Sequence, residues 1–185
     1  MSTPLERYEA LLAGGQYRAD DEQRKVAHAL DDLYHRLLQR PSRRWWRQGR
    51  VVPVKGLYLW GGVGRGKTWL MDLFYESLPF DERLRVHFHR FMARVHAELR
   101  QRSQEADPLP EIARGWANQF RVLCFDEFFV SDIADAMLLS GILEALFDRG
   151  VTLVTTSNIP PHELYAGGLQ RARFLPAIDL IERHT

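Results

Sequence analysis

Eight consecutive residues carry the clearest chemical signal in the chain, because glycines there precede a lysine and a threonine. They match the pattern G-x-x-x-x-G-K-[ST] at every fixed position and read Gly61, Gly62, Val63, Gly64, Arg65, Gly66, Lys67 and Thr68. Glycines let a backbone wrap closely around phosphate oxygens, and the N–H groups that open a following helix attract an anion. We therefore expect this segment to bind nucleotide phosphates, with the Lys67 ammonium between the β- and γ-phosphates and the Thr68 hydroxyl on Mg²⁺.

Two carboxylates follow an apolar run, residues 122–125, further along the chain. If that run is a strand beside the glycine-rich loop, its carboxyl end faces the same phosphates. We expect Asp126 to hold Mg²⁺ and Glu127 to orient and deprotonate an attacking water. The alternative is that both acids only cap a strand end.

A third polar position ends the next apolar run, residues 151–156. Asn158 follows that run, and its amide is suited to hold the attacking water or the γ-phosphate from the other side. As a turn residue before Pro160 and Pro161, however, it needs no such role.

Short apolar runs alternate with helical patterns in the second part of the chain, which is typical of a parallel sheet covered by helices. We expect strands at residues 56–60, 84–91, 121–125 and 151–156, helices at 67–78, 92–102 and 133–147, and helical runs at 161–169 and 174–183. The fold class is therefore α/β, a P-loop NTPase sheet spanning residues 51–185. Residues 1–50 form a small helical extension, with a capping box at Thr3 to Glu6, a second helix over 21–40 and a basic connector over 41–50.

Composition narrows the class of protein. The 185 residues include 45% hydrophobic side chains, and 25 basic residues nearly balance 24 acidic ones, so the overall charge does not point to nucleic acid or a membrane. A single cysteine, Cys124, allows no intramolecular disulfide and no cysteine-based zinc site. The first residues lack the apolar run of a secretory signal, and we expect a cytoplasmic location.

Absent motifs narrow the type of nucleotide enzyme. The chain has no N-K-x-D element, which GTPases use to read guanine, and no L-S-G-G-Q signature of transporter ATPases. Phe129 stands where a D-E-x-D helicase carries its second acid. The class of nucleotide enzyme that remains is an ATPase with an Asp-Glu pair, Asp126 and Glu127, and a polar sensor, Asn158.

Longer blocks resemble the ZapE family of AAA+ ATPases, bacterial cell-division proteins with mitochondrial relatives. They read GLYLWGGVGRGKTWLMDLF, VHFHRFM, VLCFDEFFVSDIADAML, and TTSN followed by GLQRARFLPAI. The resemblance implies ATP hydrolysis with Mg²⁺, a homo-oligomer and a division-related protein partner. It also implies that Lys67 and Thr68 belong to Walker A, Asp126 and Glu127 to Walker B, and Asn158 to the sensor. Arg171 or Arg173 is similar in position to an arginine finger that acts on the neighbouring subunit's nucleotide.

The chain departs from that family near its end. A AAA+ sheet adds a fifth strand beside the P-loop strand and then a helical lid, and neither is visible before Thr185. We expect a fragment of a longer protein, with the P-loop strand at an exposed edge of the sheet and weak hydrolysis.

Two other functions stay open at this stage. A P-loop kinase is the enzymatic alternative, although the pairing of Glu127 with Asn158 speaks against it. The other is a nucleotide-dependent scaffold or nucleic-acid-binding switch with negligible turnover. Its feature is the basic connector, where four arginines flank Trp45 and Trp46: Arg43, Arg44, Arg47 and Arg50. These arginines could grip phosphates while the tryptophans stack on bases, or the tryptophans could fold onto the core and leave the arginines in solvent. His87 and His89, expected on one face of a strand, favour packing or polar contacts over a metal site.

Overall fold

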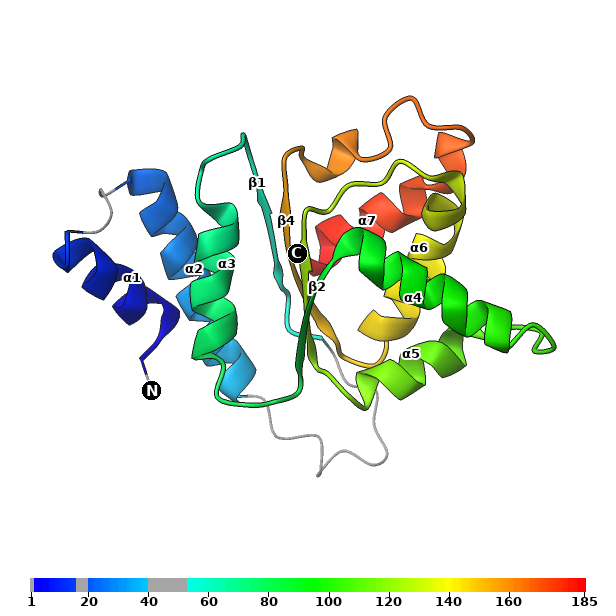
Figure 1. The fold of residues 1–185 in the computed structure, drawn as a ribbon, viewed down its shortest axis with the longest axis horizontal. Helices are drawn as coiled ribbons and strands as arrows, with labels where there is room; N and C mark the ends of the chain where they lie inside the picture. Colours follow the sequence, from blue (N-terminus) through cyan, green and yellow to red (C-terminus); the bar gives the residue numbers. More distant parts are fainter. Residues whose placement is uncertain (1, 16–19, 40–52) are drawn as a thin grey trace.

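A four-stranded parallel sheet forms the centre of the computed structural model, which describes residues 2–15, 20–39 and 53–185 (Figure 1). The strands lie in the order β1-β4-β3-β2 and all neighbours pair in parallel. Their bounds are β1 (Leu57–Trp60), β2 (Arg83–His87), β3 (Val122–Asp126) and β4 (Thr152–Ser157). The expected α/β fold with a P-loop strand at the sheet edge is confirmed, and among the described residues no strand pairs with the outer side of β1.

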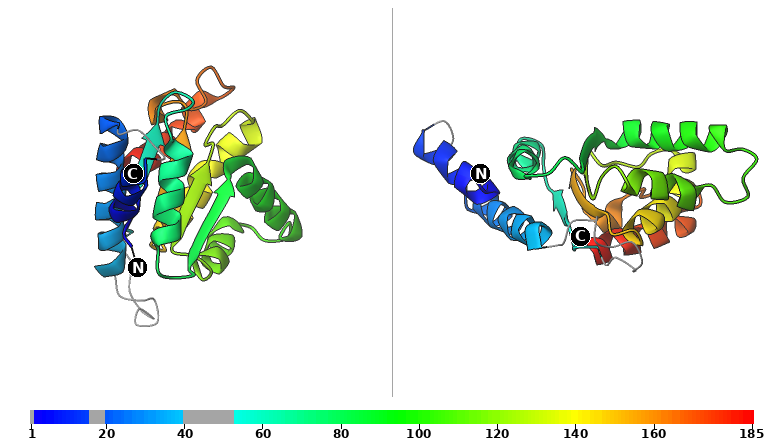
Figure 2. Two further views of the ribbon diagram at one scale, coloured as in Figure 1. Left: turned by 60° about the vertical axis from the view of Figure 1, so that its left-hand side comes forward. Right: turned by 90° about the horizontal axis from the view of Figure 1, so that it is seen from below.

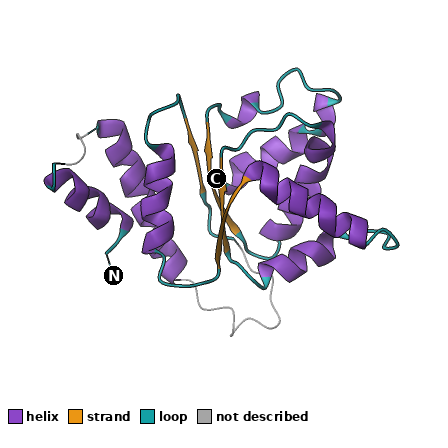
Figure 3. Cartoon of the chain, viewed as in Figure 1, coloured by secondary structure: helices purple, strands orange, loops and turns teal. Residues whose placement is uncertain are grey.

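Helices cover both faces of the sheet (Figures 1 and 3). One layer contains α1 (Pro4–Ala13), α2 (Asp21–Gln39) and α3 (Lys67–Ser77). The opposite layer contains α4 (Phe88–Gln101), α5 (Leu109–Ala117), α6 (Ile133–Phe147) and α7 (Leu175–His184), together with the short 3-10 helices η2 (Pro161–Glu163) and η3 (Arg171–Arg173). No helix of the described part is long and apolar enough to cross a membrane.

The sheet separates two hydrophobic clusters because successive side chains of a strand point to opposite faces. On β3, Val122 and Cys124 belong to the cluster under α1, α2 and α3, whereas Leu123 and Phe125 belong to the cluster under the other helices. Both strand faces are therefore apolar, which is why β3 reads as a continuous hydrophobic run.

The two N-terminal helices share the hydrophobic cluster of α3 (Figure 2). Tyr8 of α1 and Leu33 of α2 are fully buried there with Phe74 of α3. The predicted capping box at the start of α1 is confirmed, since the Glu6 N–H donates to Thr3 Oγ1 (3.3 Å) and the Thr3 N–H donates to Glu6 Oε2 (2.9 Å). The basic connector, with the arginines and tryptophans of the predicted nucleic-acid patch, lies outside the described residues.

Two sequence-based predictions in the second part of the chain are wrong, and one helix was not predicted. β2 ends at His87, not at residue 91, because Phe88, Phe91 and Val95 repeat at helical spacing and are buried as one face of α4. His89 is therefore on α4 and does not share a strand face with His87, although the two rings stack with centroids 5.8 Å apart.

The other two differences concern helices. Residues 161–169, expected to be helical, contain only the short η2 and turns. The helix α5 was not predicted, although its buried residues Ile112, Ala113, Trp116 and Ala117 follow the i, i+1, i+4, i+5 spacing of a helix face.

Candidate nucleotide-binding site

The glycine-rich loop connects the carboxyl end of β1 to the first turn of α3 (Figure 1). Gly61, Gly64 and Gly66 have φ values of 145°, 80° and 78°, a region of backbone conformation that side chains with a Cβ rarely adopt. Gly66 is the N-cap of α3 and supplies no side-chain cap, so the positive end of the helix faces the concave side of the loop. This geometry is what a bound phosphate requires.

Lys67 folds back over the loop and meets the residue predicted to be the sensor. Its Nζ donates to the carbonyl oxygens of Gly61 (2.7 Å) and Gly62 (2.8 Å) and to Oδ1 of Asn158 (3.2 Å). Burial lowers the pKa of Lys67 from its ordinary value. Two of the predicted site residues, 91 positions apart in sequence, thus lie in direct contact.

The two adjacent acids occupy different environments at the end of β3. Asp126 is buried, with 9% of its side chain exposed, whereas 79% of the Glu127 side chain is exposed. Glu127 has a φ of 53°, a strained conformation for a residue with a side chain, and its N–H donates to Thr156 Oγ1 (3.2 Å). The left-handed turn separates the two carboxylates, as the assignment of one to metal and the other to water requires.

A cavity of about 470 Å³ joins the loop to the ends of β3 and β4. It contains Glu127 and Asn158, and its remaining lining residues are Val63, Gly64, Arg65, Gly66, Lys67, Thr68, Trp69, Thr156 and Ser157. The structure therefore brings the predicted phosphate loop, the predicted base and the predicted sensor to one cavity, which we call the phosphate cavity.

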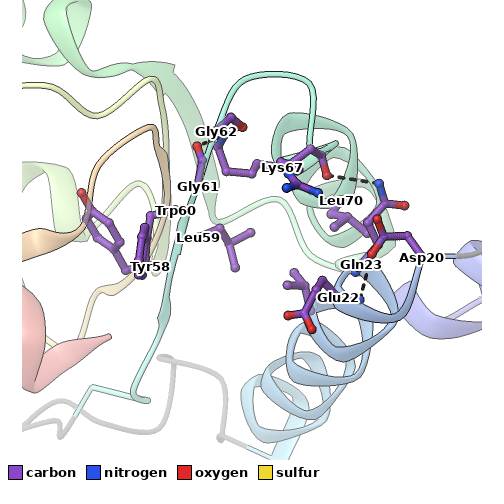
Figure 4. A pocket seen from close by; sticks show the side chains of 12 residues that line it. Asp20, Glu22, Gln23, Tyr58, Leu59, Trp60, Gly61, Gly62, Lys67 and Leu70 are labelled. Atoms are coloured by element: carbon purple, nitrogen blue, oxygen red, sulfur yellow. Dashed lines mark hydrogen bonds between the residues drawn. The ribbon is translucent and has the colours of Figure 1, made fainter.

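A second cavity of about 440 Å³ lies between the loop, β1 and the start of α2 (Figure 4). Its lining includes Tyr58 and Trp60 of β1 and Gln23 of α2, and it shares Arg65 and Lys67 with the phosphate cavity. Gln23 Nε2 donates to the Arg65 carbonyl oxygen (3.1 Å), which ties α2 to the loop. We call this the α2 cavity.

Thr68 and Asp126, the residues assigned to Mg²⁺, suit that ion when a nucleotide supplies further oxygen ligands. The Thr68 side chain is at the exposed start of α3, and Asp126 offers hard oxygen ligands, which Mg²⁺ prefers. Both Asp126 oxygens accept hydrogen bonds from Arg85, from Nε to Oδ2 (2.7 Å) and from Nη2 to Oδ1 (3.2 Å), but each keeps a further lone pair. Within the described ranges no three His, Cys, Asp or Glu residues gather as a metal cluster, so phosphate and water must complete the shell.

The two arginines predicted as candidates for an arginine finger lie on η3 and line neither cavity of their own chain among the described residues. Arg171 Nη2 donates to the His162 carbonyl oxygen (2.6 Å). Arg173 is exposed, and its Nη1 donates to Gln170 Oε1 (3.1 Å).

Three residues of the site were not assigned to it from the sequence: Gln23, Arg85 and His87. The ring atom His87 Nδ1 is buried without a hydrogen-bond partner and lies 3.9 Å from Glu127 Oε2, so β2 presents a basic side chain to each of the two acids. Arg85 and His87 are two residues apart on β2, so they lie on one face of the strand, and this spacing could have indicated that both face the site. Nothing local in the sequence points to Gln23, because α2 meets the loop only through the tertiary fold.

A family model described as AFG1-like ATPase matches residues 2–185. The chain belongs to the AFG1-like ATPase family. The predicted resemblance is thereby confirmed, since cell division protein ZapE of Escherichia coli (strain K12) is 53% identical over 98% of this chain. An uncharacterized protein of Schizosaccharomyces pombe is 49% identical over 98% of the chain.

This AFG1-like chain spans about half the length of those two relatives, 52% of the first and 48% of the second. Among solved structures, the crystal structure of DnaI superposes with a TM-score of 0.61 at 18% identity, covering 91% of this chain and 84% of that one. The identity is low, so this likeness supports the fold alone.

Proposed function

We propose that this AFG1-like chain binds ATP with Mg²⁺ and hydrolyses it by in-line attack of water on the γ-phosphate. The observation that carries the proposal is the contact between Lys67 and Asn158 at a cavity that Glu127 also lines. A loop that only reversed the chain direction would not need a strained acid, Glu127, and an amide, Asn158, directly after two further strands.

In this mechanism Lys67 exchanges its carbonyl partners for β- and γ-phosphate oxygens and spreads the charge that develops on them. Thr68 and Asp126 would hold Mg²⁺, whose chemistry is to neutralise charge on the same oxygens. Asn158 orients the attacking water, and Glu127 accepts its proton as the water oxygen bonds to phosphorus and the bond to the ADP oxygen breaks. The exposure of the Glu127 carboxylate suits a group that must reach a water molecule.

The α2 cavity is the proposed position of the nucleobase. It adjoins the phosphate cavity at Arg65 and Lys67, and the side chains of Leu59 and Val26, on the α2 side of the sheet, offer apolar surface to a purine ring (Figure 4). The proposed preference for adenine over other bases follows from membership of the AFG1-like ATPase family.

An assembly with a trans arginine is the proposed active form. Arg173 is the better candidate, because it is exposed and bonded only to a neighbouring glutamine, whereas Arg171 is anchored to a backbone carbonyl. The name of the ZapE relative, a cell division protein, supports a role in cell division, and we propose a cytoplasmic location and a protein partner from the division machinery.

The test is phosphate release from ATP at several protein concentrations, with Mg²⁺ and with EDTA. We expect release only with Mg²⁺, a rate per subunit that rises with protein concentration, and loss of that rise in Arg173→Ala with ATP affinity unchanged. Tight ATP binding without release at any concentration would contradict the enzyme and favour the nucleotide-dependent switch. Transfer of phosphate to an acceptor other than water would favour a kinase.

A further inference from the structure

One arginine bridges two carboxylates beside the phosphate cavity. Arg85 of β2 holds both oxygens of Asp126 at the end of β3, and its third nitrogen, Nη1, donates to Oδ1 of Asp72 on α3. The side chains are 23%, 9% and 37% exposed for Arg85, Asp126 and Asp72, so the cluster is largely shielded from water. All three guanidinium nitrogens are engaged.

The fold explains why these three residues meet. β2 and β3 pair in parallel with Arg85 opposite Cys124 and His87 opposite Asp126, so Arg85 and Asp126 lie on the same sheet face, two residues apart in register. That face is covered by α3, where Asp72 follows Thr68 by four residues, one helical turn later on the same side. The cluster thus connects the end of β3 to the helix turn that carries Thr68.

The chemistry of a guanidinium suits two tasks here. Its planar fork binds a carboxylate through two parallel hydrogen bonds and fixes the rotation of that group, which an ammonium cannot do. Its positive charge also compensates two carboxylates, whose mutual repulsion and desolvation would otherwise be unfavourable.

Without Arg85, the same place would offer a different ligand set. Asp72 and Asp126 carboxylates and the Thr68 hydroxyl are all hard oxygen donors, and a divalent cation binds such donors readily when they carry net negative charge. The guanidinium therefore occupies the electrostatic position that a divalent cation would otherwise fill before any nucleotide arrives.

We propose that Arg85 is a positioning residue of this site, which fixes the Asp126 carboxylate and, as a built-in cation between Asp72 and Asp126, makes divalent-metal binding depend on bound nucleotide. This inference rests on the proposed function, because the phosphates of the bound nucleotide complete the coordination shell of the metal ion. Because metal binding depends on the nucleotide, the divalent ion enters the site as part of a metal–nucleotide complex.

The test measures Mn²⁺ binding to the nucleotide-free protein by electron paramagnetic resonance. Arg85→Met removes the charge and the fork, and Arg85→Gln is a second neutral variant should the first not fold. Arg85→Lys keeps the charge but loses the fork. Arg83→Met is the matched control, because Arg83 is on the same strand face but donates to the carbonyl oxygens of Tyr75 (2.6 Å) and Leu78 (2.5 Å).

We expect Arg85→Met and Arg85→Gln to bind Mn²⁺ without nucleotide at least about tenfold more tightly than the wild type, because the repulsion between the guanidinium and the divalent ion is removed. Arg85→Lys and Arg83→Met should bind it as weakly as the wild type. In phosphate release, Arg85→Lys should lower the rate at saturating Mg²⁺, because Asp126 is no longer fixed. Unchanged Mn²⁺ binding in both neutral variants would overturn the proposal and leave Arg85 a structural ion pair. Failure of the proposed function would appear separately, as a wild-type protein that neither binds nor hydrolyses ATP.

Discussion

Replacing Lys67 by methionine removes the ammonium that, among the described residues, lines the phosphate cavity, and it keeps a long apolar side chain at the start of α3. In the structure, Lys67 Nζ donates to the carbonyl oxygens of Gly61 and Gly62 at 2.7 and 2.8 Å. With ATP bound, we expect these two hydrogen bonds to be replaced by two to phosphate oxygens, which are charged acceptors.

A hydrogen bond to a charged group contributes about 1.5–3 kcal/mol, so two of them contribute about 3–6 kcal/mol to ATP affinity. Since each factor of ten corresponds to roughly 1.4 kcal/mol, Lys67→Met should weaken ATP binding by about 100-fold to 10,000-fold. We expect a loss of ATP affinity near the lower end of this range, because Lys67 must give up its hydrogen bonds to the loop carbonyls and to Asn158 when ATP binds.

The assay is isothermal titration of ATP in the presence of Mg²⁺, with thermal unfolding as a check that the variant folds. Lys55→Met is the matched control, because it removes an exposed lysine just before β1 that lines neither cavity of the described part. It should bind ATP within about twofold of the wild type. Binding by Lys67→Met within about threefold of the wild type would refute the assignment of the loop.

Two further predictions follow from contacts of the described residues. Gln23→Ala removes a neutral hydrogen bond of about 0.5–1.5 kcal/mol to the Arg65 carbonyl, so ATP titration should show about twofold to tenfold weaker binding. The control Gln101→Ala, on the exposed end of α4, should leave ATP affinity unchanged. If Gln23→Ala binds ATP as tightly as the wild type, α2 does not position the loop. Burial raises the pKa of the Cys124 thiol to about 12, so at pH 8 it stays protonated and shielded, and a disulfide reagent should label it only at the rate of unfolding; rapid labelling of the native protein would contradict the placement of β3.

Local patterns were sufficient to predict most of the fold that carries the site. The octet from Gly61 to Thr68 needs only its own backbone and the helix that follows, and the apolar runs that became β3 and β4 are buried on both faces. The end of β2 was predicted wrongly, because the alternation in VHFHRF imitates a strand until the helical repeat of Phe88, Phe91 and Val95 is weighed against it.

The contacts that the site residues make could not be predicted from the sequence. Asp126 was predicted as a metal ligand, but its two hydrogen bonds from Arg85 depend on the register of β2 with β3. The hydrogen bond from Gln23 to the loop depends on how α2 packs against α3, which no local spacing encodes. Such contacts join segments that are far apart in the chain.

The most direct test of the central claim compares ATP binding and phosphate release in Glu127→Gln. The glutamine keeps the size and polarity of the side chain but cannot accept the proton of water, and general-base catalysis contributes about 100-fold to 10,000-fold. The account predicts ATP affinity within about twofold of the wild type and phosphate release slower by at least about 100-fold. Phosphate release by Glu127→Gln at the wild-type rate would contradict it.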